Sequence, residues 1–488
     1  MSNLPTQEDS TTLNTQLEAI RSAFFGYVPG PVLVTPWAID RPIEQAVTLP
    51  NREMLIVDNA TTDERAMELI VEDWLKAIEN TDSNTPENHT ALAMVLGPAL
   101  DMQGASSVEA WSSIGRLARK AISFWWAASS TGLGNESFNL ELRDAWQISP
   151  GKRGQVMPAP EIVVWRTLAT HLGGRTAIEE LDLMPGVRML LAGPKPSGYG
   201  DNEHDESGIL VLWLDDPSID NRVLSIPLSM SRVTQIDVFN NQTNLPLEYI
   251  GDLNLPVHRI TIGRSPIIVT EVNTDLVRFL SAIELTPNTL QSRSGIHKHA
   301  LVLTNPWGAT IRGRVYIVEP GGYTSESNAI DRSWEITPRV VPFVLDAYES
   351  REMPIDIAFS LGEIAGDKKL TFDVELQADA DYPLMRIERS IELKLDGVEM
   401  QLTARRGHDG ITVVAVAVTN KFDTTQNFEL IAIPPNESRL RRAINSIKPG
   451  QRVVREFAFR KTNPGDQVIV TLLVPKSSTR INKVVRVP

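Results

Sequence analysis

From about residue 185 to the C-terminus, hydrophobic positions recur with a period of two. Short apolar runs, for example at residues 209–214 and 267–272, are separated by clusters of Gly, Pro, Asn and Asp. Alternate side chains of a β-strand face opposite sides of the sheet, so this pattern is typical of antiparallel β-sandwiches. It predicts a first β-sandwich over residues 185–285.

The last 200 or so residues contain an internal repeat. Ala300-Leu-Val-Leu-Thr-Asn305 matches Val414-Ala-Val-Ala-Val-Thr-Asn420, because each is an alternating strand that ends in Thr-Asn. Further pairs follow in the same order: Ile336-Thr-Pro338 with Ile447-Lys-Pro449, and Gly366-Asp367 with Gly465-Asp466. An ordered set of matches indicates duplication. We predict two immunoglobulin-like β-sandwiches, over residues 286–395 and 396–488.

Residues 21–184 have helical periodicity instead. Apolar stripes predict helices that begin near residue 61, near Ser106-Ser-Val-Glu109 and at about Pro160, and the last of these ends before Gly173-Gly174. Apolar runs at residues 31–36 and 54–57 predict two buried strands. This region is therefore a mixed α/β domain, and the polar residues 1–20 are predicted to be disordered.

Composition excludes several kinds of chemistry. The 488 residues contain no cysteine, which rules out disulfides, Cys-ligated zinc, iron–sulfur clusters and thiol nucleophiles. The chain has no phosphate-binding loop, dinucleotide fingerprint, GxSxG elbow or HExxH motif, so we predict neither a cofactor nor a metal. No apolar run is long enough to span a bilayer, and the N-terminus lacks the features of a secretory signal. These two features favour the cytoplasm.

Charge is distributed unevenly along the chain. The net charge is −14, which disfavours general nucleic-acid binding, yet residues 401–488 hold 15 basic and 6 acidic side chains. The basic residues concentrate at Arg439, Arg441, Arg442, Lys448, Arg452, Arg455, Arg460 and Lys461. One interpretation is a patch for an anionic partner, such as an acidic glycan, a lipid head group or an acidic face of the same protein. The other is a solvated surface of outward-facing strand side chains.

Several segments from about residue 160 onward carry a family resemblance. They are Met157-Pro-Ala-Pro-Glu161, Gly186-Val-Arg-Met-Leu-Leu191, Gly208-Ile-Leu-Val-Leu-Trp213, Ile236-Asp-Val-Phe-Asn240, Ile262-Gly-Arg-Ser-Pro-Ile-Ile-Val269 and the ending Arg480-Ile-Asn-Lys-Val-Val-Arg-Val-Pro488. This part of the chain resembles the C-terminal portion of bacterial, planctomycete-type glycoside-hydrolase-like proteins. The resemblance implies the end of a (β/α)₈ barrel, then a β-sandwich and immunoglobulin-like modules, and a cell-surface or periplasmic location.

The resemblance also implies what kind of domain residues 21–184 form. A full barrel takes about 250 residues, whereas only 184 precede the first predicted sandwich. We therefore expect a multi-domain α/β plus all-β protein, in which a partial (β/α) barrel-like domain over residues 21–184 precedes three antiparallel β-sandwich domains.

Candidate sugar chemistry lies in the N-terminal domain. Glycoside hydrolysis needs two carboxylates, and Asp40 and Asp58 follow the two predicted strands. Trp37, Trp125 and Trp126 are candidate ligand-binding residues, because tryptophan stacks on apolar sugar faces. The alternatives are that both acids are helix caps or loop residues and that the tryptophans pack in the core.

Two histidines form a further candidate pair. His297 and His299 are two residues apart in a predicted strand, so they share one face, where they could hold a metal. No third ligand is evident nearby in the sequence, which is why we predict no metal site.

Three functional hypotheses remain open. The first is a non-catalytic carbohydrate-associated binding or scaffold protein, which the short front domain and the lack of catalytic motifs favour. The second is an active glycoside hydrolase that uses paired carboxylates such as Asp40 and Asp58. The third is a cell-surface structural or adhesion component, which regular assembly would favour.

Overall fold

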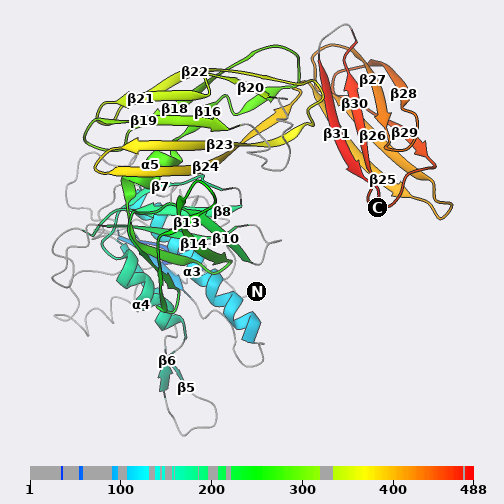
Figure 1. Cartoon of the computed structure of the whole chain (residues 1–488). Helices are drawn as coiled ribbons and strands as arrows, with labels where there is room; N and C mark the ends of the chain where they lie inside the picture. Colours follow the sequence, from blue (N-terminus) through cyan, green and yellow to red (C-terminus); the bar gives the residue numbers. More distant parts are fainter. Residues whose placement is uncertain are drawn as a thin grey trace, which may run out of the picture. The chain divides into compact units, whose positions relative to one another are not determined.

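The chain divides into two compact units. A computed structural model describes residues 35–36, 54–58, 91–96, 107–130, 138–142, 146–148, 156–158, 160–184, 186–195, 207–215, 221–318, 334–475 and 479–488. The first unit comprises Met1–Tyr249 and Val257–Val277, and the second Ile250–Pro256 and Arg278–Pro488. Strands arranged in several separate sheets predominate in the described residues (Figure 1), so the predicted multi-domain β architecture is confirmed.

A small parallel sheet lies near the N-terminus. Its strands pair in chain order and are β1 (Thr35–Pro36), β2 (Met54–Asp58), β3 (Ala91–Leu96) and β4 (Phe138–Leu142). Parallel neighbours need a crossover connection, and α3 (Ser107–Ser130) lies between β3 and β4 in the chain. The predicted strand over residues 54–57 is present as β2. Residues 1–20 and the helix predicted near residue 61 lie outside the described residues, and a barrel-like arrangement stays a prediction.

Two helices pack on a larger antiparallel sheet in the first unit. They are α3 and α4 (Pro160–Leu172), and both begin within a residue of the predicted starts. The sheet order is β12-β11-β15-β9-β8-β7. Its strands are β7 (Ala177–Glu180), β8 (Val187–Ala192), β9 (Gly208–Leu214), β11 (Val233–Asp237), β12 (Gln242–Leu245) and β15 (Ile267–Val272). A short pair, β5 (Trp146–Ile148) and β6 (Val156–Pro158), precedes α4.

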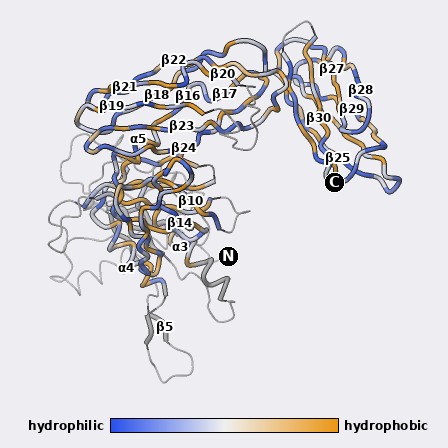
Figure 2. Tube along the Cα trace, viewed as in Figure 1, coloured by the Kyte–Doolittle hydropathy of each residue, from blue (hydrophilic) through white to orange (hydrophobic). Residues whose placement is uncertain are grey.

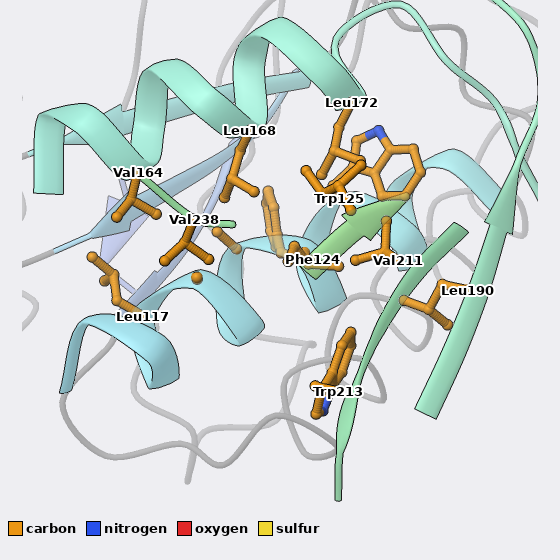
Figure 3. Packing of buried hydrophobic residues seen from close by; sticks show 14 of the residues in the cluster. Leu117, Phe124, Trp125, Val164, Leu168, Leu172, Leu190, Val211, Trp213 and Val238 are labelled. Carbon is orange, nitrogen blue, oxygen red and sulfur yellow. The ribbon is translucent and has the colours of Figure 1, made fainter. Parts of the chain in front are cut away.

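The central strands of this sheet are buried on both faces. Every residue of β8 and β9 is buried. One core joins the sheet to the two helices and includes Phe124, Trp125, Leu168 and Trp213 (Figure 3). The opposite face packs against a three-stranded sheet of order β10-β14-β13, with strands Asn221–Ile226, Leu255–Gly263 and Glu248–Ile250. The helical core therefore joins residues on both sides of the predicted boundary at residue 185.

Two β-sandwiches follow α5 (Thr274–Ser281) in the chain. Along their strands hydrophilic and hydrophobic positions alternate (Figure 2), as expected when one face of each sheet is buried. The first sandwich contains β16 (Glu284–Thr286), β17 (Thr289–Gln291), β18 (His297–Thr304), β19 (Ile311–Val318), β20 (Trp334–Thr337), β21 (Val340–Leu345), β22 (Ser350–Phe359), β23 (Gly366–Gln377) and β24 (Asp381–Lys394). The last contains β25 (Val398–Arg406), β26 (Thr412–Asn420), β27 (Gln426–Ile433), β28 (Leu440–Ile447), β29 (Arg452–Phe459), β30 (Gln467–Leu473) and β31 (Arg480–Arg486).

The two sandwiches share one topology. The last one pairs β25-β26-β29 in one sheet and β28-β27-β30-β31 in the other. The first one pairs β16-β18-β22-β20 and β17-β24-β23-β19-β21, which is the same order with β17 and β20 added at sheet edges. When the seven strands that both sandwiches share are numbered in chain order, strands 1, 2 and 5 form one sheet, and the other has the order 4-3-6-7. This is an immunoglobulin-like arrangement in which the fourth strand pairs in the second sheet.

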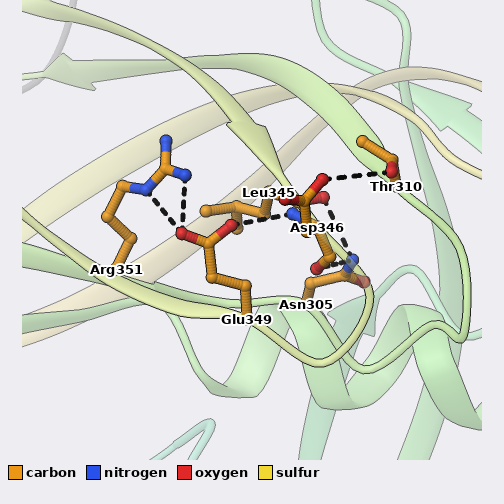
Figure 4. Close-up of polar contacts among 6 residues, drawn as sticks. All are labelled: Asn305, Thr310, Leu345, Asp346, Glu349 and Arg351. Atoms are coloured by element: carbon orange, nitrogen blue, oxygen red, sulfur yellow. Dashed lines mark hydrogen bonds and ion pairs between the residues drawn. The ribbon is translucent and has the colours of Figure 1, made fainter.

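A buried asparagine occupies the same place in both sandwiches. Asn305 follows β18, and its side-chain Nδ2 donates to the carbonyls of Ala309 (2.9 Å), Leu345 (3.3 Å) and Asp346 (2.7 Å), while its Oδ1 accepts the N–H of Trp307 (2.9 Å). Figure 4 shows Asn305 beside Leu345 and Asp346, together with Thr310, Glu349 and Arg351. Asn420 ends β26 and makes the corresponding bonds apart from the one to Asp346, with Nδ2 donating to the carbonyls of Thr424 and Ile447 (both 2.9 Å) and Oδ1 accepting the N–H of Phe422 (3.0 Å). We call these two sets the asparagine clasps.

The turn that each clasp holds corrects part of the predicted repeat. Glu349 accepts the backbone N–H of Asp346 through its carboxylate (2.8 Å), and Gln451 accepts that of Lys448 through its amide oxygen (3.0 Å). The backbone N–H groups of Asn305 and Asn420 donate to the carbonyls of these same two residues, Glu349 and Gln451. The counterpart of Lys448-Pro449 is therefore the turn at Asp346, and the predicted match with Thr337-Pro338 is wrong. A match of two residues that ends in proline is too short to align the two sandwich sequences when the loops between their strands differ in length.

Asn482 joins the two sandwiches. Its side-chain Nδ2 donates to the carbonyls of Leu361 (2.7 Å) and Glu363 (2.9 Å) in the first sandwich, and its Oδ1 accepts the Thr471 hydroxyl (2.7 Å) within the last. Its backbone carbonyl accepts the N–H of Ala365 (2.7 Å). Asn482 is 1% exposed; its bond to Thr471 is buried, and its bonds to Leu361 and Glu363 are part-buried.

A second set of bonds lies beside Asn482. The Arg480 backbone N–H donates to the Ser292 carbonyl (3.1 Å), and the Ser292 hydroxyl donates back to the Arg480 carbonyl. We call the bonds of Asn482, Ser292 and Arg480 the inter-sandwich joint.

Candidate functional site

The predicted sugar site falls largely outside the described residues. Asp40 and Trp37 are not among them. Asp58 is described through its backbone, as the last residue of parallel strand β2. Trp125 is 5% exposed and lies in the helical core, where its ring centroid is 6.1 Å from that of half-buried Trp126. The acid pair and the ligand-binding tryptophans stay predictions.

The histidine pair is buried in the first immunoglobulin-like sandwich. His297 stacks on Phe359 with ring centroids 5.0 Å apart, and its Nε2 lies 3.2 Å from the Arg293 carbonyl. Both ring nitrogens of His299 are buried without a hydrogen-bond partner. Burial lowers the pKa of both imidazoles below the ordinary value of 6.5. The described residues contain no group of three or more His, Cys, Asp or Glu side chains placed to hold a metal.

The basic cluster forms one edge of the last sandwich. Strands β28 and β29 are edge strands of the two opposed sheets, and they contact each other (Figure 1). Residues 439–461 hold eight basic side chains against one acidic, a net charge of +7. We call these eight residues the basic edge: Arg439, Arg441, Arg442, Lys448, Arg452, Arg455, Arg460 and Lys461. All are exposed except Arg455, which is half-buried.

The basic edge has three levels along its length. Arg439 precedes β28 and Arg460 follows β29, so they lie at the same end, where Glu437 accepts the Lys461 backbone N–H. Arg442 and Arg455 lie within the strands. The tight turn at residues 448–451 brings Lys448 and Arg452 to the other end.

Side chains of the middle level come from both sheets and lie on the faces that the two sheets turn toward each other. Arg442 pairs across the sheet with Leu430, and Arg455 with Val416, and both of these partners are core residues. Directly paired residues on antiparallel strands point to the same face. The two arginines therefore lie on the inward-facing sides of opposed sheets, at the edge where β28 and β29 contact each other.

Most of the basic edge has no side-chain partner within the described residues. Arg441 pairs with Glu429 at 3.2 Å, Arg452 donates to the Gln401 amide oxygen at 3.1 Å, and Arg455 donates to the carbonyl of its neighbour Val454. The sole acidic residue of the stretch, Glu456, pairs with Arg405 of β25 at 3.2 Å. In the described parts of the chain, no side-chain hydrogen bond or ion pair engages the other five cations, which are Arg439, Arg442, Lys448, Arg460 and Lys461.

The sequence located this surface but missed the residues that support it. The run of Arg and Lys is sufficient by itself to identify the basic edge. Asn482 gave no such signal, because a single asparagine in an alternating strand has the pattern of a solvent-facing residue. Asn482 faces outward from the last sandwich, between Ile481 and Lys483. It is buried because the first sandwich covers it.

Comparison with known proteins gives no family. No family model and no curated protein matches the chain. Among solved structures, red sea bream transglutaminase is similar over 42% of this chain and 31% of its own, with 10% identity and a TM-score of 0.21. The Pseudomonas aeruginosa CupB2 chaperone matches 42% of this chain and 100% of its own, with 12% identity and a TM-score of 0.17, and the class 5 fimbriae chaperone CfaA matches 42% of this chain and 99% of its own, at 12% and 0.18. Likenesses at this level assign neither family nor function. In the described part of the chain, none of the helices combines the length and apolarity needed to cross a membrane.

Proposed function

We propose that this protein is a non-catalytic binding and scaffold protein whose last sandwich contacts an anionic partner through the basic edge. The observation that carries the proposal is the set of five exposed cations that have no side-chain partner among the described residues, at two adjoining edge strands. Unpaired guanidinium and ammonium groups keep their full capacity to bind carboxylate, sulfate or phosphate. The carbohydrate assignment rests on the resemblance to glycoside-hydrolase-like proteins.

The inter-sandwich joint supports the scaffold part of the proposal. Separating the sandwiches would expose the Asn482 side chain and leave the carbonyls of Leu361 and Glu363 without their donor. Each such hydrogen bond, when it is exchanged for bonds to water, contributes about 0.5–1.5 kcal/mol. Several such bonds at one contact favour the joined state of the two modules, which suits a spacer that presents a surface.

Binding of a polyanion tests the proposal. The full chain should bind immobilised heparin, used as a sulfated polysaccharide probe, and the affinity should fall as salt is raised because screening weakens exposed charge pairs. The double variant Arg442→Gln/Arg455→Gln should weaken binding by about tenfold or more, since each removed cation loses a charge-assisted contact.

The matched control is Arg405→Gln/Lys421→Gln. It removes two positive charges from the same sandwich at residues that already pair with Glu456 and Glu399. The control should bind within about twofold of the parent protein, since paired surface charges contribute little. Equal loss in both double variants, or no binding at low salt, would show that the basic edge is not an anion-binding surface.

A glycoside hydrolase is the second candidate. The favouring observation is that Asp58 stands at the carboxyl end of a parallel strand, which is where barrel enzymes carry catalytic acids. Aryl-glycosides and polysaccharides should be screened for hydrolysis with the full chain. Turnover that Asp40→Asn or Asp58→Asn abolishes would overturn the non-catalytic proposal.

A further inference from the structure

We propose that the partner is a linear acidic polysaccharide that lies lengthwise along the basic edge. This inference rests on the proposed function and adds the class and the orientation of the ligand. Strand β28 contains eight residues. At about 3.3 Å per residue it is about 26 Å long. The three levels of cations are distributed along that length rather than gathered around one point.

The spacing of the cations selects an extended ligand. Arg439 and Arg460 lie at one end of the strands and Lys448 at the other, with Arg442 and Arg455 between them. A small anion would meet one level only, because the cations do not converge on a shared position. A polymer with a charge on successive units can engage all three levels at once, and each added contact strengthens binding to the same chain.

The direction of the side chains argues against a flat anionic surface. Arg441 pairs across the sheet with Ile431 and forms its ion pair with Glu429, on the outer face of one sheet. Arg452 pairs with Thr419 next to the core pair of Val453 and Val418, which places it on the outer face of the opposite sheet. The basic edge therefore carries charge on the outer faces of both sheets as well as between them. A bilayer could reach only part of it, whereas a flexible chain can follow it.

Charge, rather than the type of cation, narrows the anion further. Six of the eight cations are arginines, whose planar guanidinium donates paired N–H groups to carboxylate and phosphate alike. Duplex nucleic acid carries one charge per about 1.7 Å along its axis, and the net charge of −14 on the whole protein repels so dense a polyanion. A polysaccharide with one carboxylate or sulfate per sugar carries its charges farther apart than duplex DNA and meets less repulsion.

A length series tests the inference with the full chain. Heparin oligosaccharides of increasing length should bind with rising affinity until the oligosaccharide spans the edge, and then the affinity should level off. The disaccharide should bind about a hundredfold more weakly than the spanning length, since it forgoes at least two charge-assisted contacts of about tenfold each.

Variants at the two ends sharpen the test. Arg439→Gln/Arg460→Gln removes the cations at one end of the basic edge, and Lys448→Gln/Arg452→Gln removes those at the other end. Each double variant should therefore shorten the oligosaccharide length at which affinity levels off. Arg405→Gln/Lys421→Gln should leave that length unchanged. All substituted side chains are exposed or half-buried at the surface, and unchanged hydrogen exchange in the core strands would verify folding.

The possible results separate the inference from the proposed function. Equal affinity for oligosaccharides of all lengths would show that the ligand does not lie lengthwise along the basic edge, and it would leave the proposed anion binding in place. Tighter binding to DNA of equal charge, or to anionic phosphatidylserine vesicles, would overturn the polysaccharide class. Salt-sensitive self-association abolished by the same end variants would identify a second copy of this chain as the ligand instead. No binding to any polyanion would overturn the proposed function itself.

Discussion

The first immunoglobulin-like sandwich, residues 284–394, carries 12 basic and 17 acidic side chains, whereas residues 398–486 of the last carry 15 and 7. The net charges are −5 and +8, although strand order and the corresponding clasp bonds are the same. The net charge can differ this much between the two sandwiches because exposed strand positions contribute little to stability. Both sandwiches keep a buried core and an asparagine clasp.

The contrast is sharpest at one edge. Residues 337–359 of the first sandwich correspond to the stretch 439–461, and they hold two basic and four acidic residues against eight and one. Strand β20 also covers β22 in the first sandwich, whereas β29 has no further neighbour among the described strands. Charge on an open edge strand disfavours pairing with another sheet. The charges of the basic edge therefore protect an open sheet edge from pairing with another sheet.

The largest expected effect comes from breaking a clasp. Asn420→Ala should destabilise the last sandwich by about 3–5 kcal/mol, because the buried Ile447 carbonyl and the part-buried Thr424 carbonyl and Phe422 N–H lose their partner at about 1–3 kcal/mol each. Asn305→Ala should do the same to the first sandwich alone. Hydrogen exchange followed peptide by peptide reports each sandwich separately.

Asn445→Ala is the matched control for the clasp. Asn445 is exposed on β28, and its replacement should change protection by less than about 0.5 kcal/mol. If Asn420→Ala behaved like this control, the clasp would contribute nothing to stability.

An intermediate effect on stability is expected at a core position where the two sandwiches carry side chains of different size. Gly313 and Phe428 occupy matching places, each eight residues after its clasp asparagine. A Cβ on Gly313 would lie 2.0 Å from the Glu375 carbonyl and 2.7 Å from the Phe343 ring. Gly313→Ala should therefore cost about 1–3 kcal/mol through overpacking, measured by chemical denaturation.

Gly362→Ala is the comparison for Gly313. A Cβ there meets only the Ser360 hydroxyl, at 3.4 Å. A cost for Gly362→Ala as large as that for Gly313→Ala would show that loss of glycine, rather than the crowded cross-strand pair, causes the destabilisation.

The smallest effect is a difference in acid sensitivity. The lowered pKa of His297 and His299 means that the unfolded chain takes up protons first as the pH falls. The stability of the first sandwich should thus be full above about pH 7 and decrease as the pH falls below 6.5 toward the folded-state pKa. The last sandwich, whose only histidine is exposed His408, should lack this loss.

His299→Leu isolates the source of that loss. Removing the unpartnered imidazole should reduce the difference in hydrogen-exchange protection between about pH 7.5 and about 5.5 in β18 and β22, the strands that pair there. An unchanged pH dependence in this variant would assign the acid sensitivity to other groups.

Individual residues show how far sequence patterns reach. The capping sequence at Ser106 and the glycines at Gly173-Gly174 predicted the start of α3 and the end of α4, because helix ends are local features. The matching Thr-Asn endings predicted that Asn305 and Asn420 are equivalent, and their hydrogen bonds are. The Pro338 match failed, because loop length between strands is not encoded in a dipeptide.

The amino-acid sequence by itself determined the period-two strands, the duplicated sandwich and the basic cluster, since alternation, repetition and charge are properties of the chain. Only the tertiary structure decided that Arg442 and Arg455 meet at one edge from opposed sheets, that helices α3 and α4 cover a sheet, and that Asn482 is buried. These are contacts between residues distant in sequence, and their free energy depends on which surfaces exclude water together, which no local pattern specifies.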